Sequence, residues 1–172
     1  MRRFGVLVAA VAAERLAELV VSDRNLRWSL ANGGVERGSR HYPAMVALHV
    51  GLLAGSLAEA AFDRRPVPRA QAHAAAAVVL ASQGLRWWCI ATLGRQWNTR
   101  VVVVPSAPLV TGGPYRWLRH PNYVAVAAEG LALPLAGGAR VTALVFTVLN
   151  AVLLLGVRIP TEDRALAELS GG

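Results

Sequence analysis

The sequence predicts an all-α integral membrane protein with five transmembrane helices, of which the last two form a hairpin. Three observations lead to this fold class. The chain contains several long apolar runs, and 55% of its residues are hydrophobic. Only 16% are charged, whereas a soluble domain carries about 25%. The arginines lie mainly between the apolar runs and at their ends, where they would meet lipid head groups. We expect a single domain of 172 residues, with a three-helix part (1–93) and a part that carries the functional site (94–172).

Five apolar runs approach the length of about 20 residues that a membrane-spanning helix needs. The first resembles a signal peptide at its start, but Glu14 and Glu18 interrupt it, so we expect a retained helix. The fourth is short and carries Pro134, which favours a kinked or re-entrant end. A turn at 137–140 is short enough to join the last two runs as a hairpin. The runs are residues 4–21, 43–62, 70–93, 123–136 and 141–157.

The connections between these runs differ in character. Residues 22–42 are expected to form a polar loop, with a turn signal at 32–34. Residues 63–69 form a short connection rich in Arg and Pro. The segment 94–120 is longer and contains a run of four valines at 101–104, which suits a short strand but is too short to span a bilayer. We therefore expect the functional features outside the spans to concentrate in 94–120.

The distribution of arginine predicts which side of the membrane each loop faces, because cytoplasmic loops are rich in Lys and Arg. Five spans put the two termini on opposite sides. With the C-terminus inside, ten arginines lie on the inner side and six on the outer side. The expected location is the bacterial inner membrane, with the 94–120 segment and the tail on the cytoplasmic side. The inner set is Arg24, Arg27, Arg37, Arg40, Arg95, Arg100, Arg116, Arg119, Arg158 and Arg164, and the outer set is Arg2, Arg3, Arg64, Arg65, Arg69 and Arg140.

The basic charge does not indicate a nucleic-acid partner. The net charge is +8, and all 18 basic residues are Arg, a pattern that fits a GC-rich coding sequence. A nucleic-acid-binding protein needs a soluble basic face, and the sequence offers none. Cys89 lies in an apolar run and lacks partners at metal-ligand spacing. We expect a buried structural thiol there and no metal site.

Charged residues inside the first, third and fourth predicted spans each cost at least a few kcal/mol unless they have a partner or face a cavity. In the first run, Glu14 and Glu18 lie one turn apart on one helix face. One interpretation is pairing between helices, for example of Glu14 or Glu18 with Arg86. The other is that some of these residues line a polar substrate cavity. The set is Glu14, Arg15, Glu18, Arg86 and Glu129.

Residues 105–123 contain the densest group of chemically active side chains. The Thr-Gly-Gly-Pro sequence at 111–114 predicts a tight turn, in which glycine lets the backbone approach a ligand closely. Pro121 favours the first turn of a helix, which places Arg119 and His120 at a helix N-terminus in the membrane interface. Such a position suits a carboxylate or another anion. The alternative is an ordinary interfacial belt of aromatic residues and arginines.

The tail that follows the last span supplies a second group. If the hairpin forms, its two ends meet, so Arg158, Glu162 and Asp163 should lie near Arg119 and His120. Acidic residues beside arginines can bind a ligand that carries both an ammonium and a carboxylate. The alternative is a capped interfacial helix with surface ion pairs, which contribute little to stability.

The sequence Gly-Pro-Tyr-Arg-Trp-Leu-Arg-His-Pro-Asn-Tyr at 113–123 resembles the signature of the isoprenylcysteine carboxyl methyltransferase family. It is more distantly similar to that of membrane phospholipid methyltransferases. In the family, a Gly-x-Tyr-x-x-x-Arg-His-Pro-x-Tyr element precedes a helical hairpin and an Arg-x-x-x-Glu-Glu element follows it. The second element here is Arg158-Ile-Pro-Thr-Glu162-Asp163. The resemblance is specific over about residues 90–170, and residues 14–25 also resemble bacterial members.

The resemblance implies S-adenosylmethionine as methyl donor and gives each residue of the motif a role. Pro160 stands where the family often has a second basic residue, and Asp163 replaces the second Glu, so the contacts of the tail are expected to differ in detail. The residues implied to hold the cofactor are His120, Tyr123 and Glu162, framed by Tyr115 and the backbone from Leu109 to Gly113. Those implied to hold the oxygen anion of the acceptor, and so to be catalytic, are Arg119 and Arg158. Trp97 and Arg100 are expected to contact the acceptor.

The expected activity is O-methylation of a lipophilic acceptor embedded in the membrane. The stretch 96–100 and the tail are similar to those of bacterial relatives that O-methylate long-chain alkylpyrones or alkylresorcinols made by type III polyketide synthases. One alternative is methylation of an isoprenylcysteine carboxylate or a phospholipid amine, although an amine acceptor would favour carboxylates rather than arginines near the methyl group. Another is a membrane reductase with a nicotinamide cofactor. A third is a non-catalytic membrane scaffold or transporter.

Overall fold

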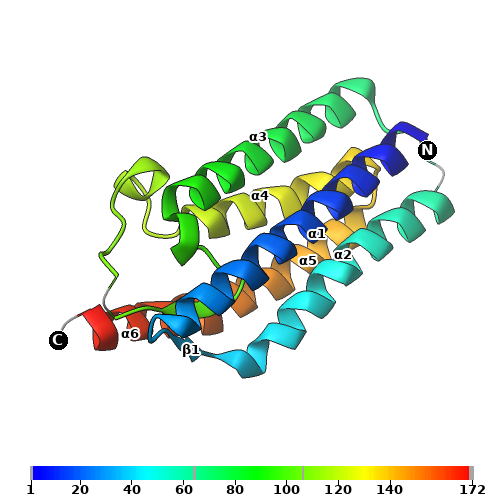
Figure 1. Cartoon of the computed structure of the whole chain (residues 1–172). Coiled ribbons are helices and arrows are strands. Elements are labelled where there is room, and N and C mark those ends of the chain that lie inside the picture. The colour runs from blue at the N-terminus through cyan, green and yellow to red at the C-terminus, as the bar shows by residue number, and fades with distance from the viewer. Residues whose placement is uncertain (1, 64, 106, 171–172) are drawn as a thin grey trace.

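The computed structural model describes residues 2–63, 65–105 and 107–170, and Figure 1 shows their long helices lying side by side in one bundle. Arg64, which the charge count above assigns to the outer side, lies outside the described residues. The last bundle helix continues through a π-helical turn, η4 (Leu154–Arg158), into the C-terminal helix α6 (Ile159–Ser170). The bundle helices are α1 (Arg2–Ala31), α2 (Tyr42–Phe62), α3 (Arg69–Leu93), α4 (Pro121–Ala136) and α5 (Arg140–Leu153).

Three helical stretches of the described chain are long and apolar enough to cross a bilayer, judged by length and composition: Ser39–Phe62, Arg69–Gln96 and Arg140–Glu168. The first helix is long but carries Glu14, Arg15 and Glu18. Helix α4 has 16 residues, which at 1.5 Å per residue reach about 24 Å, less than the roughly 30 Å of a hydrocarbon core. All five predicted helices therefore form, and a bilayer crossing by α1 and α4 stays a prediction.

Helix α1 is longer than the sequence predicted, and the expected polar loop at 22–42 was wrong. The helix continues to Ala31. Its last three turns bury Ser22, Asn25 and Ser29, which follow Glu18 at helical spacing on one face. Because these buried residues are small and polar, this part of α1 has the composition of a loop. The hydropathy pattern therefore did not predict that the helix continues here.

The remaining part of that segment contains a strand. Strand β1 (Val35–Arg37) pairs antiparallel with β2 (Val101–Val103), with Glu36 opposite Val102. The valine run thus forms the short strand that its composition suited. The pairing ties the α1–α2 connection to the 94–120 segment, at the end of the bundle where α6 also lies (Figure 1).

The α4–α5 hairpin is confirmed. Gly138, with φ +81°, makes the turn between the two helices. Both carboxylate oxygens of Glu59, near the end of α2, cap the first turn of α5 by accepting from the amides of Val141 (2.9 Å) and Thr142 (2.7 Å). Helix α4 stays helical through Pro134 in its last turn. The hairpin brings the start of α4 beside the helix that runs from α5 into α6, as the predicted meeting of the tail with Arg119 and His120 requires.

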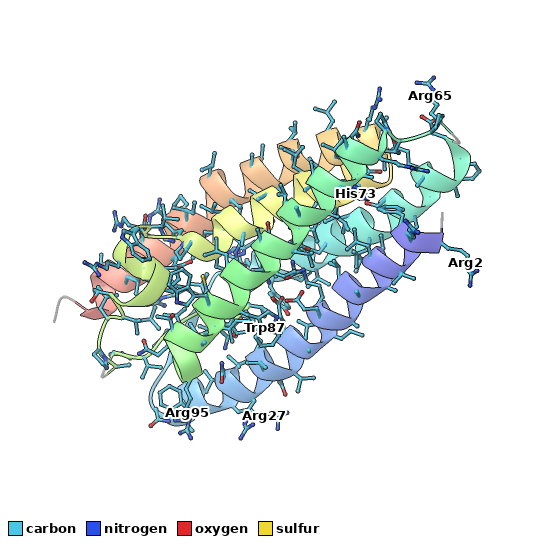
Figure 2. All side chains as sticks on the ribbon, turned by 90° about the horizontal axis from the view of Figure 1, so that it is seen from above. Arg2, Arg27, Arg65, His73, Trp87 and Arg95 are labelled. Atoms are coloured by element: carbon cyan, nitrogen blue, oxygen red, sulfur yellow. The ribbon has the colours of Figure 1, made fainter. Side chains whose placement is uncertain are left out.

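The apolar core and the polar features occupy different ends of the bundle. A buried cluster that includes Val8, Val79 and Leu133 packs α1, α3 and α4 together near the start of α1. Figure 2 shows Arg2 and Arg65 at that end and Arg27 and Arg95 at the opposite end. Arginines thus mark both ends of the bundle, as expected for a chain whose middle faces lipid.

Candidate functional site

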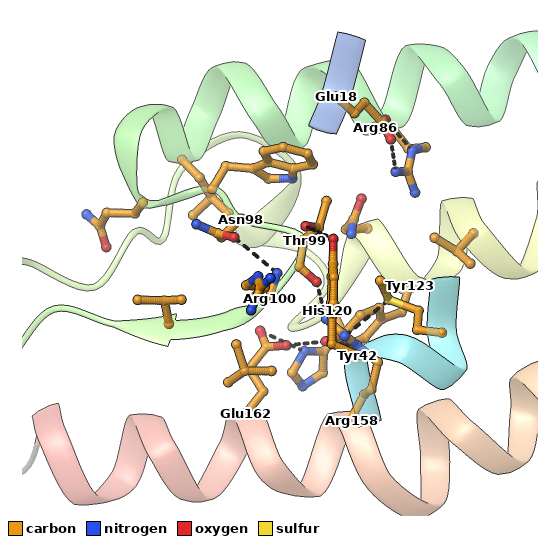
Figure 3. Close-up of a pocket in the computed structure, with 18 of the residues that line it drawn as sticks. Glu18, Tyr42, Arg86, Asn98, Thr99, Arg100, His120, Tyr123, Arg158 and Glu162 are labelled. Carbon is orange, nitrogen blue, oxygen red and sulfur yellow. Dashed lines mark hydrogen bonds and ion pairs between the residues drawn. The ribbon is translucent and has the colours of Figure 1, made fainter. Parts of the chain in front are cut away.

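A cavity of about 620 Å³ opens at the end of the bundle away from this core. Its walls come from α1, α2, α3, the 94–120 segment, the start of α4, and the helix that runs from α5 into α6 (Figure 3). Every residue predicted for the site except Gly113 lines it. These residues are Trp97, Arg100, Leu109, Tyr115, Arg119, His120, Tyr123, Arg158 and Glu162.

His120 and the two acidic residues of the tail form a polar group on one wall. The Nε2 atom of His120 lies 3.2 Å from an Asp163 oxygen, and Nδ1 lies 3.6 Å from Glu162. The hydroxyl of Tyr123 donates to Glu162, and the rings of His120 and Tyr123 stack with centroids 5.5 Å apart. The carboxylate of Glu162, with that of Asp163 beside it, raises the pKa of His120 above its ordinary value. The predicted meeting of the motif and the tail is confirmed.

Arg158 is buried at the end of the π-helical turn, a type of irregularity frequent at functional sites. Its Nη2 donates to the backbone carbonyl of Thr99 (2.9 Å), and its Nη1 lies 3.2 Å from the sulfur of Met45. Its Nε lies 3.4 Å from the hydroxyl of Tyr123. One guanidinium therefore joins α2, the 94–120 segment, α4 and the tail around the cavity.

Arg119 has a different environment from Arg158. Its side chain is 85% exposed, and its nearest acidic partner is Asp163, with 3.8 Å between nitrogen and oxygen. It lies one residue before His120, the residue that precedes α4, where Pro121 occupies the first helical position as predicted. Arg119 thus lies at the rim of the cavity, and its contact with the acceptor stays a prediction.

Gly113 shapes the turn beneath the site rather than lining it. Its φ of +55° lies in the left-handed region, and a Cβ there would approach Oγ1 of Thr92 to 2.4 Å. The turn leads into a short 3-10 helix (Gly113–Arg116) that carries Tyr115 to the cavity wall. Burial, with the Cys89 thiol beside it, raises the pKa of the Tyr115 phenol. Cys89 itself is fully buried, as predicted.

Trp97 and Arg100 are held by residues that the sequence did not single out. Asn25 of α1 donates to the backbone carbonyls of Gly94 (3.0 Å) and Trp97 (2.7 Å). Arg100 donates a 2.9 Å hydrogen bond to Glu36 of β1. This hydrogen bond and the negative charge of Glu36 raise the pKa of Arg100. Only the helical spacing of Asn25 from Glu18 could have indicated that it faces the site.

Ser22 is the second such residue. Its hydroxyl oxygen accepts from the amide of Thr99 (3.0 Å), and it lies 2.9 Å from the side-chain oxygen of Asn98. It is also 2.8 Å from the hydroxyl of Thr99. These bonds attach α1 to the loop whose Thr99 carbonyl accepts from Arg158. The position of Arg158 thus depends on a serine that the hydropathy pattern assigned to a loop.

The charged residues inside the helices form the expected pairs between helices. Glu18 and Arg86 pair, with 2.7 Å between Oε1 and Nε, and Arg15 bridges Glu18 and Glu129. The expected pairing of Glu18 with Arg86 is therefore confirmed. Arg15, Glu18 and Arg86 also line the cavity.

Residues 75–168 match the isoprenylcysteine carboxyl methyltransferase family, which is more than half of the chain. This chain belongs to that family. The match to the isoprenylcysteine carboxyl methyltransferase family covers all the predicted site residues, since these lie between Trp97 and Glu162. The chain is also 40% identical, over 167 residues, to an uncharacterized protein YpbQ of Bacillus subtilis (strain 168), with 97% of this chain and 98% of that protein covered. No solved structure matched the chain.

Isoprenylcysteine carboxyl methyltransferases are membrane enzymes that use S-adenosylmethionine, and the cavity fits that cofactor. Its volume lies within the roughly 300–1,000 Å³ typical of small-molecule sites. Glu162 and Asp163 are carboxylates that suit the cationic groups of the cofactor. Three buried atoms on lining residues, Nη1 of Arg86, Nε1 of Trp97 and Oδ1 of Asn122, have no hydrogen-bond partner among the described residues. Such atoms are uncommon in folded proteins, so a ligand that satisfies them is expected.

Proposed function

We propose that this chain is an S-adenosylmethionine-dependent O-methyltransferase that acts on a lipophilic acceptor drawn from the bilayer, such as the ring hydroxyl of a polyketide alkylpyrone or alkylresorcinol. The observation that carries the proposal is the joining of two unlike surfaces in one cavity. The polar group around His120 and Glu162 forms one wall, and apolar side chains of α1 and α2 form another. A water-soluble cofactor and a lipid-soluble acceptor can therefore meet there.

The apolar wall suits a long alkyl chain. Leu16 and Leu19 of α1 face the cavity, as do Val46 and Val50 of α2. All four are also substantially exposed. In a membrane that exposed surface would meet lipid, so an acceptor chain can lie along α1 and α2 while its head reaches the polar wall. Burying each methylene of such a chain is worth about 0.8 kcal/mol.

The site residues divide into those that hold the cofactor and those that orient the acceptor. Bound S-adenosylmethionine supplies an electrophilic methyl carbon, which the acceptor oxygen takes as the carbon–sulfur bond breaks. Glu162, Asp163 and His120 hold the polar end of the cofactor at the start of α4. Arg158 orients the anionic oxygen of the acceptor without accepting its proton, because a guanidinium stays charged at neutral pH. Positioning of this kind supplies much of the catalysis in a displacement reaction.

An oxygen acceptor is favoured over an amine by the charges that face the cavity. Arg119 and Arg158 line it, and Arg158 forms no ion pair with a carboxylate among the described residues. Arg15 and Arg86 also line the cavity, but Glu18 and Glu129 balance their charges. An enolate or phenolate is stabilised by such guanidiniums, whereas a cationic ammonium is repelled. Such an acceptor has an acidic hydroxyl, so it needs no strong dedicated base. We place the polar end of the cavity on the cytoplasmic side, in keeping with the excess of arginine predicted there.

The function is tested with the full chain in lipid nanodiscs and S-adenosylmethionine labelled on its methyl group. Three acceptors are offered in parallel: a long-chain hydroxy-alkylpyrone, a farnesylated cysteine derivative and phosphatidylethanolamine. Mass spectrometry should find the label on the pyrone oxygen. Label on the cysteine carboxylate or on the phospholipid nitrogen instead would transfer the assignment to that alternative. No calorimetric binding of either S-adenosylmethionine or S-adenosylhomocysteine would overturn the class.

A matched pair of variants connects the activity to the site. Arg158→Lys keeps the charge but loses the planar fork that contacts Thr99 and Tyr123, so turnover should fall while cofactor binding persists. Arg164→Ala, on the exposed side of α6, should leave both unchanged. Equal turnover by the two variants would show that Arg158 does not orient the acceptor.

A further inference from the structure

A cluster of charged side chains lies between α1, α3 and α4, about two helical turns inside the end of α3. Arg86 pairs with Glu18 along one edge of its guanidinium, through Nε and Nη2. Arg15 donates 2.6 Å to Glu18 and also contacts Glu129. Glu18, Glu129 and Arg86 are nearly fully buried, with side chains 2%, 2% and 6% exposed. The pairs hold both guanidiniums in fixed planes.

The third guanidinium nitrogen of Arg86 takes no part in these ion pairs. Its Nη1 atom is buried and has no hydrogen-bond partner among the residues that the structure describes. Glu18 occupies the Nε and Nη2 edge, so both N–H groups of Nη1 remain free to donate. A buried charged donor without an acceptor is destabilising, and folded proteins seldom leave one unless a ligand or water completes it. Arg86 is also among the residues that line the cavity.

The charges around Arg86 select the kind of ligand. Arg15 and Arg86 are balanced by Glu18 and Glu129, and Glu14 is a further carboxylate within electrostatic range of the same group. The cluster is therefore neutral or slightly negative, so an anion would gain little there. A neutral oxygen with lone pairs, such as a ring carbonyl, satisfies Nη1 without upsetting the balance.

We propose that Arg86 is an acceptor-positioning residue whose Nη1 donates to a second, neutral oxygen on the head group of the acceptor. This inference rests on the proposed function, in which Arg158 orients the oxygen that receives the methyl group. Figure 3 shows the Glu18–Arg86 pair on one side of the pocket and Arg158, His120 and Glu162 on the other. A head group held at two oxygens between these positions presents only one of them to the methyl donor.

The test compares two acceptors of equal chain length, in nanodiscs, with the full chain. One is a hydroxy-alkylpyrone, which carries a ring carbonyl, and the other is an alkylphenol with a single oxygen. Arg86→Lys keeps a charge beside Glu18 but cannot present a second edge to the cavity. It should lower kcat/KM for the pyrone by about 10- to 100-fold, as expected for one hydrogen bond from a charged donor. The phenol value and cofactor binding should not change. The thermal midpoint should fall, because lysine keeps only part of the buried two-point pair with Glu18, but this loss acts on both acceptors alike. Arg69→Lys, exposed at the start of the same helix, is the matched control.

Several results would overturn the inference. An equal fall for both acceptors would make Arg86 merely structural, and no fall for either would remove it from the acceptor site. If Arg86→Lys does not fold, the unmodified protein can still refute the subsite, because equal rates for the pyrone and the phenol would mean that the second oxygen contributes nothing. Failure of the unmodified protein to methylate either acceptor would instead count against the proposed function.

Discussion

Gly113→Ala tests whether the turn beneath the site has the conformation on which the cofactor site depends. Gly113 has φ +55°, and a Cβ there would lie 2.4 Å from Oγ1 and 2.9 Å from Cγ2 of Thr92. The Thr92 hydroxyl cannot rotate away freely, because it donates to the carbonyl of Trp88 at 2.7 Å. The substitution therefore combines a backbone penalty with a steric one.

The two penalties can be estimated separately. A left-handed conformation costs a residue with a Cβ roughly 1–2 kcal/mol. Moving the Thr92 hydroxyl breaks a hydrogen bond worth about 1 kcal/mol. The sum, about 2–3 kcal/mol, corresponds to roughly 30- to 150-fold in the population of the native turn. If S-adenosylmethionine binds only that turn, its affinity falls by up to the same factor. Adding Thr92→Ala should restore the part due to the clash and leave the backbone part.

Calorimetric titration of S-adenosylmethionine into the protein in detergent measures this effect, and the neighbouring glycine supplies the control. Gly112 has an extended backbone, with φ −87°, and a Cβ there would meet nothing within 4 Å. Gly112→Ala should bind the cofactor like the unmodified protein. Equal affinities for the Gly112 and Gly113 variants would refute the reasoning, because the turn would then tolerate a side chain.

Two further predictions concern the polar contacts of the site. The pKa of His120, measured by NMR titration of its ring protons, should lie above 6.5 and return toward it in Glu162→Gln, since the nearby carboxylate of Glu162 is the main cause of the shift. Because the folded-state pKa is raised, the contact of protonated His120 with the carboxylates of Glu162 and Asp163 stabilises the fold fully below about pH 6.5. This stabilisation is lost as the pH rises through the raised pKa, so the thermal midpoint should fall across that window. In Glu162→Gln, the thermal midpoint should depend less on pH. Ser22→Ala removes the acceptor of the Thr99 amide and should lower the free energy of unfolding by about 1–3 kcal/mol, seen as a lower thermal midpoint. The control is Ser39→Ala, at an exposed serine, which should change the midpoint little. Equal midpoints for the two serine variants would contradict the buried contact.

Parts of the fold and site that depend on short stretches of sequence could be predicted. The hairpin follows from a two-glycine turn between apolar runs, and the hairpin in turn places the tail beside the motif. This is why the contacts of His120 with Glu162 and Asp163 were predictable without knowledge of any other helix. The start of α4 at Pro121 was likewise predictable, because a proline fits the first turn of a helix.

Features that depend on pairs distant in sequence were not predictable. Ser22 and Asn25 appear as loop residues until their partners at 94–99 are known, since a buried polar face cannot be distinguished from an exposed one by composition. The pairing of β1 with β2 joins segments more than 60 residues apart, and three residues of Val-Glu-Arg give no strand signal of their own. The π-helical turn that ends at Arg158 also has no residue pattern from which it could be predicted.

The two ends of the bundle are stabilised by different kinds of contact, and this explains why several residues that support the site are polar residues of α1 that the sequence did not predict. At the closed end, Val8 and Val79 pack with Leu133, and apolar contacts hold the helices together. At the other end such packing would fill the cavity, so the walls must be fixed by groups that bond at their edges and leave the middle open. Ser22, Asn25 and Arg158 do this with directional hydrogen bonds to the 94–120 segment. Each such bond contributes only about 1 kcal/mol. The cavity end should therefore be the less stable end, and cofactor binding should stabilise it by mass action.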